Sequence, residues 1–134
     1  MAVRVKQKQQ TRERVLEAAF EEFTKKGLLV TKTADIAKAA HVSHGSIFAH
    51  FPTRDALILM VINQFGLHLG EELRKRIKAG SLESVLITHL KVLEKWEPFI
   101  TQLVICGPHL PEDIRVAIFN IQSGIAFYLE QAVA

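Results

Sequence analysis

The apolar and polar positions along this 134-residue chain alternate with a helical period from end to end. Between Thr11 and about Lys26, apolar side chains recur at intervals of three and four, with glutamates between them. Such spacing gathers the apolar side chains on one face of a helix. Thr11 is expected to cap this helix and Gly27 to end it. The predicted core-facing residues are Val15, Leu16, Ala19, Phe20 and Phe23.

Two short helices joined by a tight turn are predicted next. The first, Thr33–Ala40, has a face of small apolar residues, and the second, His44–Phe51, directs Ile47 inward. Ser43 is a good N-cap for the second helix, and Pro52 stops it. Two short helices around a turn of this length make a helix-turn-helix, whose second helix enters the DNA major groove. The first helix is expected to bury Ala34, Ile36, Ala37 and Ala40.

The outer face of the second helix suits contact with DNA. Small residues keep its N-terminal end thin, and histidines at both ends can donate or accept hydrogen bonds. Arg54 opens the following helix, where free amides and the positive end of the dipole favour a phosphate. Any two short amphipathic helices could also give this pattern. The candidate DNA contacts are Thr33, Ser43, His44, Gly45, Ser46, Phe48, His50 and Arg54.

A long helix is predicted from Arg54 to about Lys78, which spans about 36 Å. Ala79-Gly80 is expected to break the chain, and Ser81 to cap a helix that ends near Trp96.

A short helix, Phe99–Cys106, is expected to begin separately at Pro98, followed by a loop over residues 107–111. The last predicted helix starts at Pro111 and is apolar on much of its circumference, so it needs partners on more than one face. The chain ends at Ala134 inside this pattern, and part of the helical bundle is expected to be missing.

Composition narrows the class of protein. Apolar residues make up 49% of the chain, the N-terminus has no apolar core of a signal peptide, and the single Cys106 excludes an intrachain disulfide. A cytoplasmic protein with no membrane association is therefore expected.

Charge is distributed unevenly along the chain. Residues 1–55 carry ten Lys and Arg against six Asp and Glu, whereas the rest carries seven against eight. The basic excess thus lies on the part with the helix-turn-helix, as binding to a polyanion requires. Arg4, Lys6 and Lys8 lie in a polar arm that either tracks DNA or is a flexible tail that only aids solubility.

The stretch TKTADIAKAAHVSHGSIFAHFPTRDALI resembles the N-terminal signature of the TetR-type transcriptional repressors. The resemblance covers Thr11 to about Leu59. Its matching residues are Asp35, Ile36, Ala37, Ala40, Val42, Ser43, Gly45, His50, Phe51, Asp55 (for Glu) and Leu57.

Four residues depart from the family pattern. His41 stands where the turn usually has Gly, and it must adopt positive φ. Phe48 replaces a Tyr whose hydroxyl reaches a phosphate in the family. Lys32 stands where a Thr usually caps the first helix, which leaves Thr31 or Thr33 as the cap. Arg54 replaces a Lys and is expected to keep its phosphate contact.

The resemblance implies an all-α protein: a three-helix helix-turn-helix DNA-binding domain over residues 1–53, then a helical-bundle ligand-binding and dimerisation domain over residues 54–134. It implies a homodimeric repressor that a small-molecule effector releases from a double-stranded DNA operator. A ligand that shifts the long helix would change the spacing of the two recognition helices. No cofactor and no enzymatic activity are expected.

Pockets in helical bundles lie between helices and are lined by apolar and aromatic side chains. Cys106 and His109 form a lone C-x-x-H pair without a second pair at metal spacing, so no metal site is expected. Two alternatives remain: a sensor or interaction protein that lost operator binding, and an all-helical enzyme. The candidate ligand contacts are Phe65, His89, Trp96, Phe99, Leu103, Cys106, Phe119, Gln122 and Phe127. Residues of this kind are more often plain core than ligand contacts.

Overall fold

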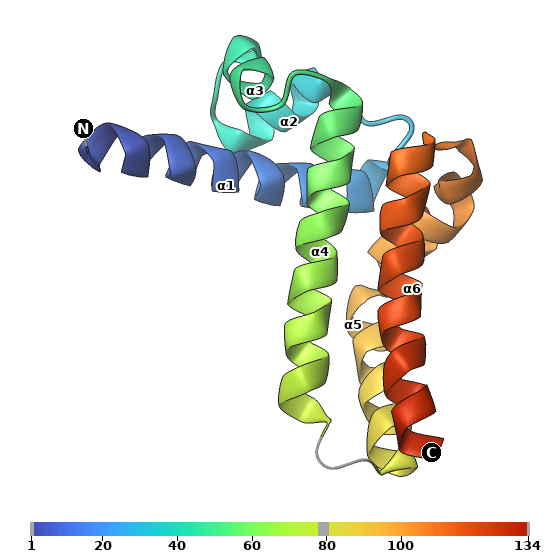
Figure 1. Cartoon of the computed structure of the whole chain (residues 1–134). Coiled ribbons are helices and arrows are strands. Elements are labelled where there is room, and N and C mark those ends of the chain that lie inside the picture. Colours follow the sequence, from blue (N-terminus) through green and yellow to red (C-terminus); the bar gives the residue numbers. More distant parts are fainter. Residues whose placement is uncertain (1, 78–80, 134) are drawn as a thin grey trace. The chain divides into compact units, whose positions relative to one another are not determined.

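The computed structural model describes residues 2–77 and 81–133, and within them every regular element is helical (Figure 1). The expected all-α class is confirmed. The predicted end of the long helix at Lys78 and the break at Ala79-Gly80 lie outside the described residues. The elements are α1 (Ala2–Lys26), α2 (Thr33–Ala40), α3 (His44–His50), α4 (Arg54–Arg76), α5 (Leu82–Cys106), the 3-10 turn η1 (Gly107–His109) and α6 (Glu112–Val133).

The chain forms two compact units, and the division between them falls inside α4, between Val61 and Ile62. The first unit contains α1, α2, α3 and the first two turns of α4. The second contains the rest of α4 together with α5 and α6.

Helix α1 begins at Ala2, so the expected polar arm and the expected cap at Thr11 are both wrong. Residues 2–10 contain neither Gly nor Pro and are rich in Lys, Arg and Gln, which are good helix formers. The Thr11 hydroxyl donates to the Gln7 carbonyl 2.9 Å away, one turn back inside the helix. Gly27 ends α1 as predicted, with a φ of 110° and its N–H bonded to the Phe23 carbonyl at 2.9 Å.

The core of the first unit is built from the faces that the apolar pattern predicts, with two exceptions. Phe20 is only half-buried and Ala34 is exposed, whereas Ala18, which the predicted stripe did not include, is buried. The buried side chains of this unit include Val15, Leu16, Ala19, Phe23, Leu28, Ile36, Ala37, Ala40, Ile47, Phe51, Leu57 and Ile58.

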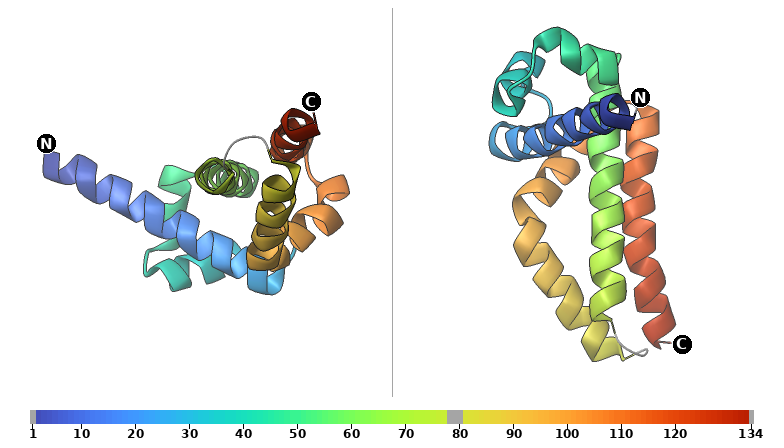
Figure 2. Two further views of the ribbon diagram at one scale, coloured as in Figure 1. Left: turned by 90° about the horizontal axis from the view of Figure 1, so that it is seen from below. Right: turned by 90° about the vertical axis from the view of Figure 1, so that its left-hand side faces the viewer.

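In the second unit, α5 continues through Pro98, so the predicted separate helix Phe99–Cys106 is wrong. Proline removes one backbone donor and crowds the carbonyl of Glu94, one turn earlier, which bends a helix without always ending it. The bend is visible in Figure 2. Buried side chains lie on one face on both sides of the proline, at Val92 before it and at Phe99 and Leu103 after it. Packing of this continuous face offsets the cost of the proline.

Helix α6 begins at Glu112, directly after Pro111, as predicted. Ile114 and Ala117 are buried, but Phe119 and Phe127 are exposed at 64% and 56%. The side of α6 that carries these rings therefore has no cover within the described residues.

Candidate nucleic-acid interface

The turn between α2 and α3 has the geometry that the helix-turn-helix requires. His41 adopts the left-handed conformation, with φ 57° and ψ 45°, which confirms the expectation for the residue in the usual place of a glycine. Its N–H donates to the Lys38 carbonyl at 3.2 Å, and that of Val42 donates to the Ala37 carbonyl at 3.0 Å. These bonds close the end of α2 and direct the chain into α3.

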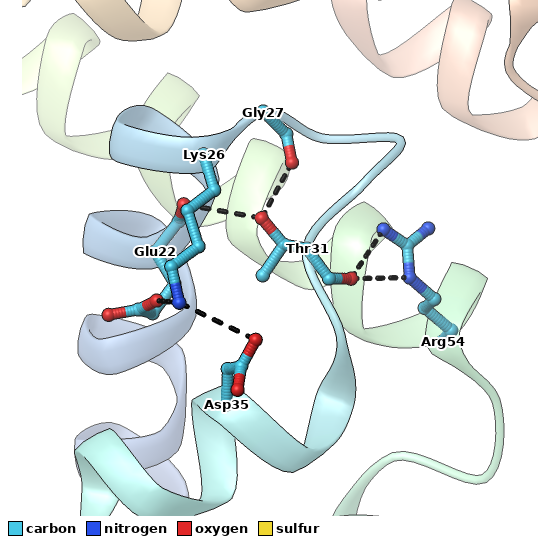
Figure 3. Close-up of polar contacts among 6 residues, drawn as sticks. All are labelled: Glu22, Lys26, Gly27, Thr31, Asp35 and Arg54. Atoms are coloured by element: carbon cyan, nitrogen blue, oxygen red, sulfur yellow. Dashed lines mark hydrogen bonds and ion pairs between the residues drawn. The ribbon is translucent and has the colours of Figure 1, made fainter.

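Ser43 caps α3 as predicted, since its Oγ accepts the backbone N–H of Ser46 at 3.1 Å. The predicted threonine cap of α2 is wrong. Lys32 occupies the N-cap position without a side-chain hydrogen bond. The buried Thr31 instead donates its hydroxyl to the carbonyls of Gly27 at 2.6 Å and Glu22 at 3.2 Å, and so fixes the connector between α1 and α2 (Figure 3).

Three predicted DNA contacts come together on the exposed side of the motif. The Nε2 of His44 is hydrogen-bonded to the hydroxyl of Thr33 at 2.8 Å. The rings of His44 and Phe48 meet edge to face with centroids 5.0 Å apart. Gly45 between them is exposed, and a Cβ added there would meet no atom within 4 Å. The first turn of α3 is therefore open to a partner.

His50 lies at the other end of α3 and is half-buried, beside the ring of Phe51. Its pKa lies below the ordinary value, first because burial disfavours the charged form and then because Lys8 and Arg12 repel it.

Arg54 points its guanidinium into its own unit, as Figure 3 shows for its contacts with Thr31. Nε and Nη2 donate to the Thr31 carbonyl at 3.2 and 2.9 Å, and Nη2 also donates to the Leu28 carbonyl. The guanidinium carbon lies 5.9 Å from the ring centroid of Phe23. Arg54 thus ties the connector after α1 to the start of α4, whereas the sequence analysis expected its charge to face outward.

A surface ion cluster joins α1 to α2. Lys26 lies 2.8 Å from a carboxylate oxygen of Glu22 and 3.4 Å from one of Asp35 (Figure 3). The hydrogen bond to Glu22 is the main reason why the pKa of Lys26 is raised. One carboxylate of α1 and one of α2 are thereby paired with the same lysine within the first unit.

Arg12 is not among the residues predicted from the sequence to contact DNA, and Lys8 was predicted only as part of the polar arm, apart from α3. Both residues line a groove of about 340 Å³ between α1 and the end of α3, together with Val5, Gln9, Ala49 and His50. The guanidinium carbon of Arg12 lies 4.6 Å above the Phe51 ring. The i, i+4 spacing of Lys8 and Arg12 would have placed them on one face if the helix had been extended to the N-terminus.

Several candidate ligand contacts form one aromatic cluster in the second unit. The ring centroid of Phe65 lies 5.7 Å from that of Trp96 and 4.9 Å from that of Phe99. Trp96 donates its indole N–H to Glu72 at 3.2 Å, and Lys95 donates to the same carboxylate at 2.8 Å. The hydrogen bond from Lys95 is the main reason why the pKa of Glu72 is lowered.

The remaining candidates are spread over the unit. Leu103 and Cys106 are buried and His89 is half-buried, whereas Phe119, Gln122 and Phe127 are exposed. The Nδ1 atom of His89 is buried and has no hydrogen-bond partner within residues 2–77 and 81–133.

The second unit also has an open groove of about 230 Å³ between α4 and α6. None of the nine predicted ligand contacts lines it. Its lining residues are Asn63, Gly66, Leu67, Leu69, Gly70, Leu73, Ala117, Asn120, Ile121, Gly124, Ile125 and Tyr128.

Within residues 2–77 and 81–133, no group of three His, Cys, Asp or Glu side chains could hold a metal ion. In the same part of the chain no single helix is long and apolar enough to cross a membrane; α3 and α4 meet those criteria only as a pair, bent by 66°.

Residues 15–61 match the family described as bacterial regulatory proteins, tetR family. An HTH-type transcriptional repressor of Mycobacterium tuberculosis strain H37Rv is 35% identical over 81 residues, which are 60% of this chain and 43% of that protein. The HTH-type transcriptional regulator TtgR of Pseudomonas putida is 38% identical over 55 residues, 41% of this chain and 26% of that protein. The chain thus spans less than half of the length of these relatives.

Solved structures share the fold at lower sequence identity. GusR of Salmonella enterica superposes with a TM-score of 0.73 at 21% identity, over 91% of this chain and 65% of that one. The transcriptional regulator FadR of Bacillus subtilis, solved in complex with stearoyl-CoA, gives a TM-score of 0.68 at 19% identity, over 90% and 68%. These likenesses support the fold.

Proposed function

We propose that this chain, whose residues 15–61 form a tetR-family helix-turn-helix module, is a sequence-specific DNA-binding transcriptional repressor that a small-molecule ligand releases from its operator. The observation that carries the proposal is the open first turn of α3. Ser43 fixes the start of this helix, while Gly45 and His44 are exposed on it. A helix presented in this way fits the major groove with its N-terminal residues at the base edges.

Within this proposal, His44 reads a base and Thr33 orients it. The 2.8 Å hydrogen bond between the Thr33 hydroxyl and Nε2 occupies that atom and leaves the Nδ1 atom for a base edge or a phosphate. Phe48 is 40% exposed and supplies an apolar contact, for example to a thymine methyl. Ser46 is half-buried, and its backbone N–H donates to the Ser43 cap.

Arg54 takes a positioning role in the proposal. Its Nε and Nη2 donors are engaged by the carbonyls of Thr31 and Leu28, so it contributes to DNA affinity by holding α4 against the connector. A phosphate at the start of α4 would then be bound by backbone amides and the helix dipole.

The ligand is proposed to bind in the second unit. The aromatic cluster around Phe65 and Trp96 and the buried Nδ1 of His89 are apolar and polar groups of the kinds that line such pockets. FadR of Bacillus subtilis, which shares this fold, was solved with stearoyl-CoA. A ligand could act on α3 through α4, which contributes residues to both units. It would do so only if its affinity differs between two arrangements of the protein.

A homodimer is part of the same proposal, because a two-fold pair of helix-turn-helix motifs reads two half-sites about one DNA turn apart. The exposed Phe119 and Phe127 of α6 are the candidate contacts. Sedimentation of the chain alone and with its DNA would test this: a protein that stays monomeric on a two-half-site duplex contradicts the dimer.

DNA selection from a random pool, followed by titration of the selected duplex and a scrambled one, tests the DNA-binding function. We expect at least about a thousandfold preference for the selected duplex. His44→Ala should reduce that preference about tenfold or more, whereas Lys25→Ala, at the far end of α1, should leave it unchanged. Equal affinity for both duplexes would contradict sequence-specific binding.

The exposed Phe48 allows a converse test. Phe48→Tyr adds the hydroxyl that the family pattern has at this position, and a new hydrogen bond to a phosphate should tighten binding to both duplexes about threefold or more. Tighter binding to the selected duplex alone would place residue 48 against a base instead.

A further inference from the structure

A basic groove on the first unit lies between α1 and the end of α3, and the function proposed above gives it no role. Lys8 and Arg12 stand one turn apart on α1 and face the end of α3 at His50. Three groups that are cationic or can become so thus line one groove.

Neither Lys8 nor Arg12 pairs with a carboxylate among the described residues. Other cations of this protein do have acidic partners: Lys26 lies 2.8 Å from Glu22, and Lys95 lies 2.8 Å from Glu72. Like charges placed side by side without a counter-charge repel each other and attract an anion.

The guanidinium of Arg12 is held in place by its stacking on the Phe51 ring, with its carbon 4.6 Å from the ring centroid. A stacked guanidinium keeps the N–H groups at its edge available for a phosphate oxygen. Phe51 is buried in the core of the unit, so this support is rigid.

The position of the groove suits the backbone of a duplex already bound by α3. Six residues separate His44 from His50, which corresponds to about 9 Å along the helix. The major groove is about 12 Å wide, so if the first turn of α3 reads base edges, its last residue lies near the rim, where the phosphates are.

We propose that Lys8, Arg12 and His50 form a phosphate seat that binds one backbone phosphate of a DNA duplex together with one proton. This inference rests on the proposed DNA-binding function. The proton goes to the imidazole of His50, because a phosphodiester stays anionic at every pH at which the protein is folded. Binding thereby takes up a proton, and DNA affinity rises as the pH falls.

The direction follows from the groups that act on His50. In the free protein its pKa is lowered by burial first and by Lys8 and Arg12 next; its aromatic neighbour Phe51 is uncharged. A bound phosphate neutralises both cations and accepts a hydrogen bond from the imidazolium, so the pKa rises in the complex. Proton uptake is therefore greatest between the His50 pKa of the free protein, which lies below the ordinary value, and the higher His50 pKa of the complex.

The test uses the full chain and a mixed-sequence duplex of about two helical turns. Binding is measured at several salt concentrations between about pH 5.5 and 7.5, and the His50 imidazole is titrated by NMR with and without DNA. The variants are Arg12→Gln, Lys8→Gln and His50→Gln. The matched control is Lys25→Gln, an exposed lysine in the last turn of the same helix.

We expect the His50 pKa to rise when DNA binds, and His50→Gln to lower proton uptake by up to one proton relative to the unaltered protein. Arg12→Gln should reduce the slope of log affinity against log salt by about 0.9, whereas Lys25→Gln should not. Lys8 is exposed, so Lys8→Gln removes a charge from the groove and leaves the packing of the unit intact. This variant should raise the His50 pKa in the free protein, and it should also reduce the salt slope of DNA binding.

An unchanged His50 pKa on binding, or variants of Lys8 and Arg12 that behave like Lys25→Gln, would overturn the seat while leaving DNA binding in place. Failure of the unaltered protein to bind any duplex at low salt would overturn the proposed function as well.

Discussion

Replacing Arg54 by alanine removes a guanidinium that makes three hydrogen bonds to two backbone carbonyls, those of Leu28 and Thr31. Leu28 and Thr31 are 0% and 2% exposed, so their carbonyls gain little from water when the guanidinium is gone. A hydrogen bond to a charged donor contributes about 1.5–3 kcal/mol. Because Arg54 itself is partly exposed and two of its bonds share one acceptor, we expect a total loss of about 2–4 kcal/mol.

Urea unfolding followed by circular dichroism measures this loss. With a slope of roughly 2 kcal/mol per molar urea, the midpoint should fall by about 1–2 M. Arg54→Lys keeps the charge but loses the planar fork, and it should show about half of the effect. The control is Arg14→Ala, an exposed arginine on α1, which should stay within about 0.5 kcal/mol of the unaltered protein.

A loss below about 0.5 kcal/mol in Arg54→Ala would refute the positioning role, because it would show that water replaces the guanidinium at both carbonyls. The salt slope of DNA binding gives a second test. If Arg54 acts by positioning, Arg54→Ala leaves the slope unchanged at temperatures where the variant is folded. A salt slope reduced by about 0.9 in Arg54→Ala would instead show that Arg54 contacts a phosphate directly, as the sequence predicted.

Three further predictions concern single side chains. Ser43→Ala should cost about 1 kcal/mol through loss of the α3 cap, and Ser43→Asp should restore it in thermal melts. Gly70→Ala should stabilise α4 by up to about 1 kcal/mol, since the added Cβ meets nothing within 4 Å. In Gly66→Ala the added Cβ would lie 3.0 Å from another side chain, and this close contact should cancel the gain in stability. Glu72→Gln should cost about 0.5–1 kcal/mol at pH 7 because it breaks the exposed pair with Lys95. The Glu72 pKa is lowered by folding, so this stabilisation is present above about pH 4.5 and lost on acidification; equal costs at pH 7 and pH 3 in urea melts would contradict it.

The sequence by itself determined the helix-turn-helix, because each of its boundaries depends on residues next to it in the chain. Ser43 caps α3 through an amide three residues later, and His41 closes α2 through carbonyls three and four residues earlier. The 3.6-residue period placed Ile36 and Ile47 in the core for the same local reason. Such interactions need no knowledge of how distant segments pack.

The tertiary structure decided which partners the charged residues and the proline have. Arg54 donates hydrogen bonds to carbonyls 23 and 26 residues earlier. The sequence alone does not distinguish an arginine at a helix start that faces solvent from one that is hydrogen-bonded within the protein. His50 lines one groove with Lys8 and Arg12 only because α1 begins as early as Ala2 and passes the end of α3. Pro98 stays inside α5 because the buried face on both sides of it outweighs one lost backbone hydrogen bond. That balance depends on the packing of the whole unit, which local sequence does not contain.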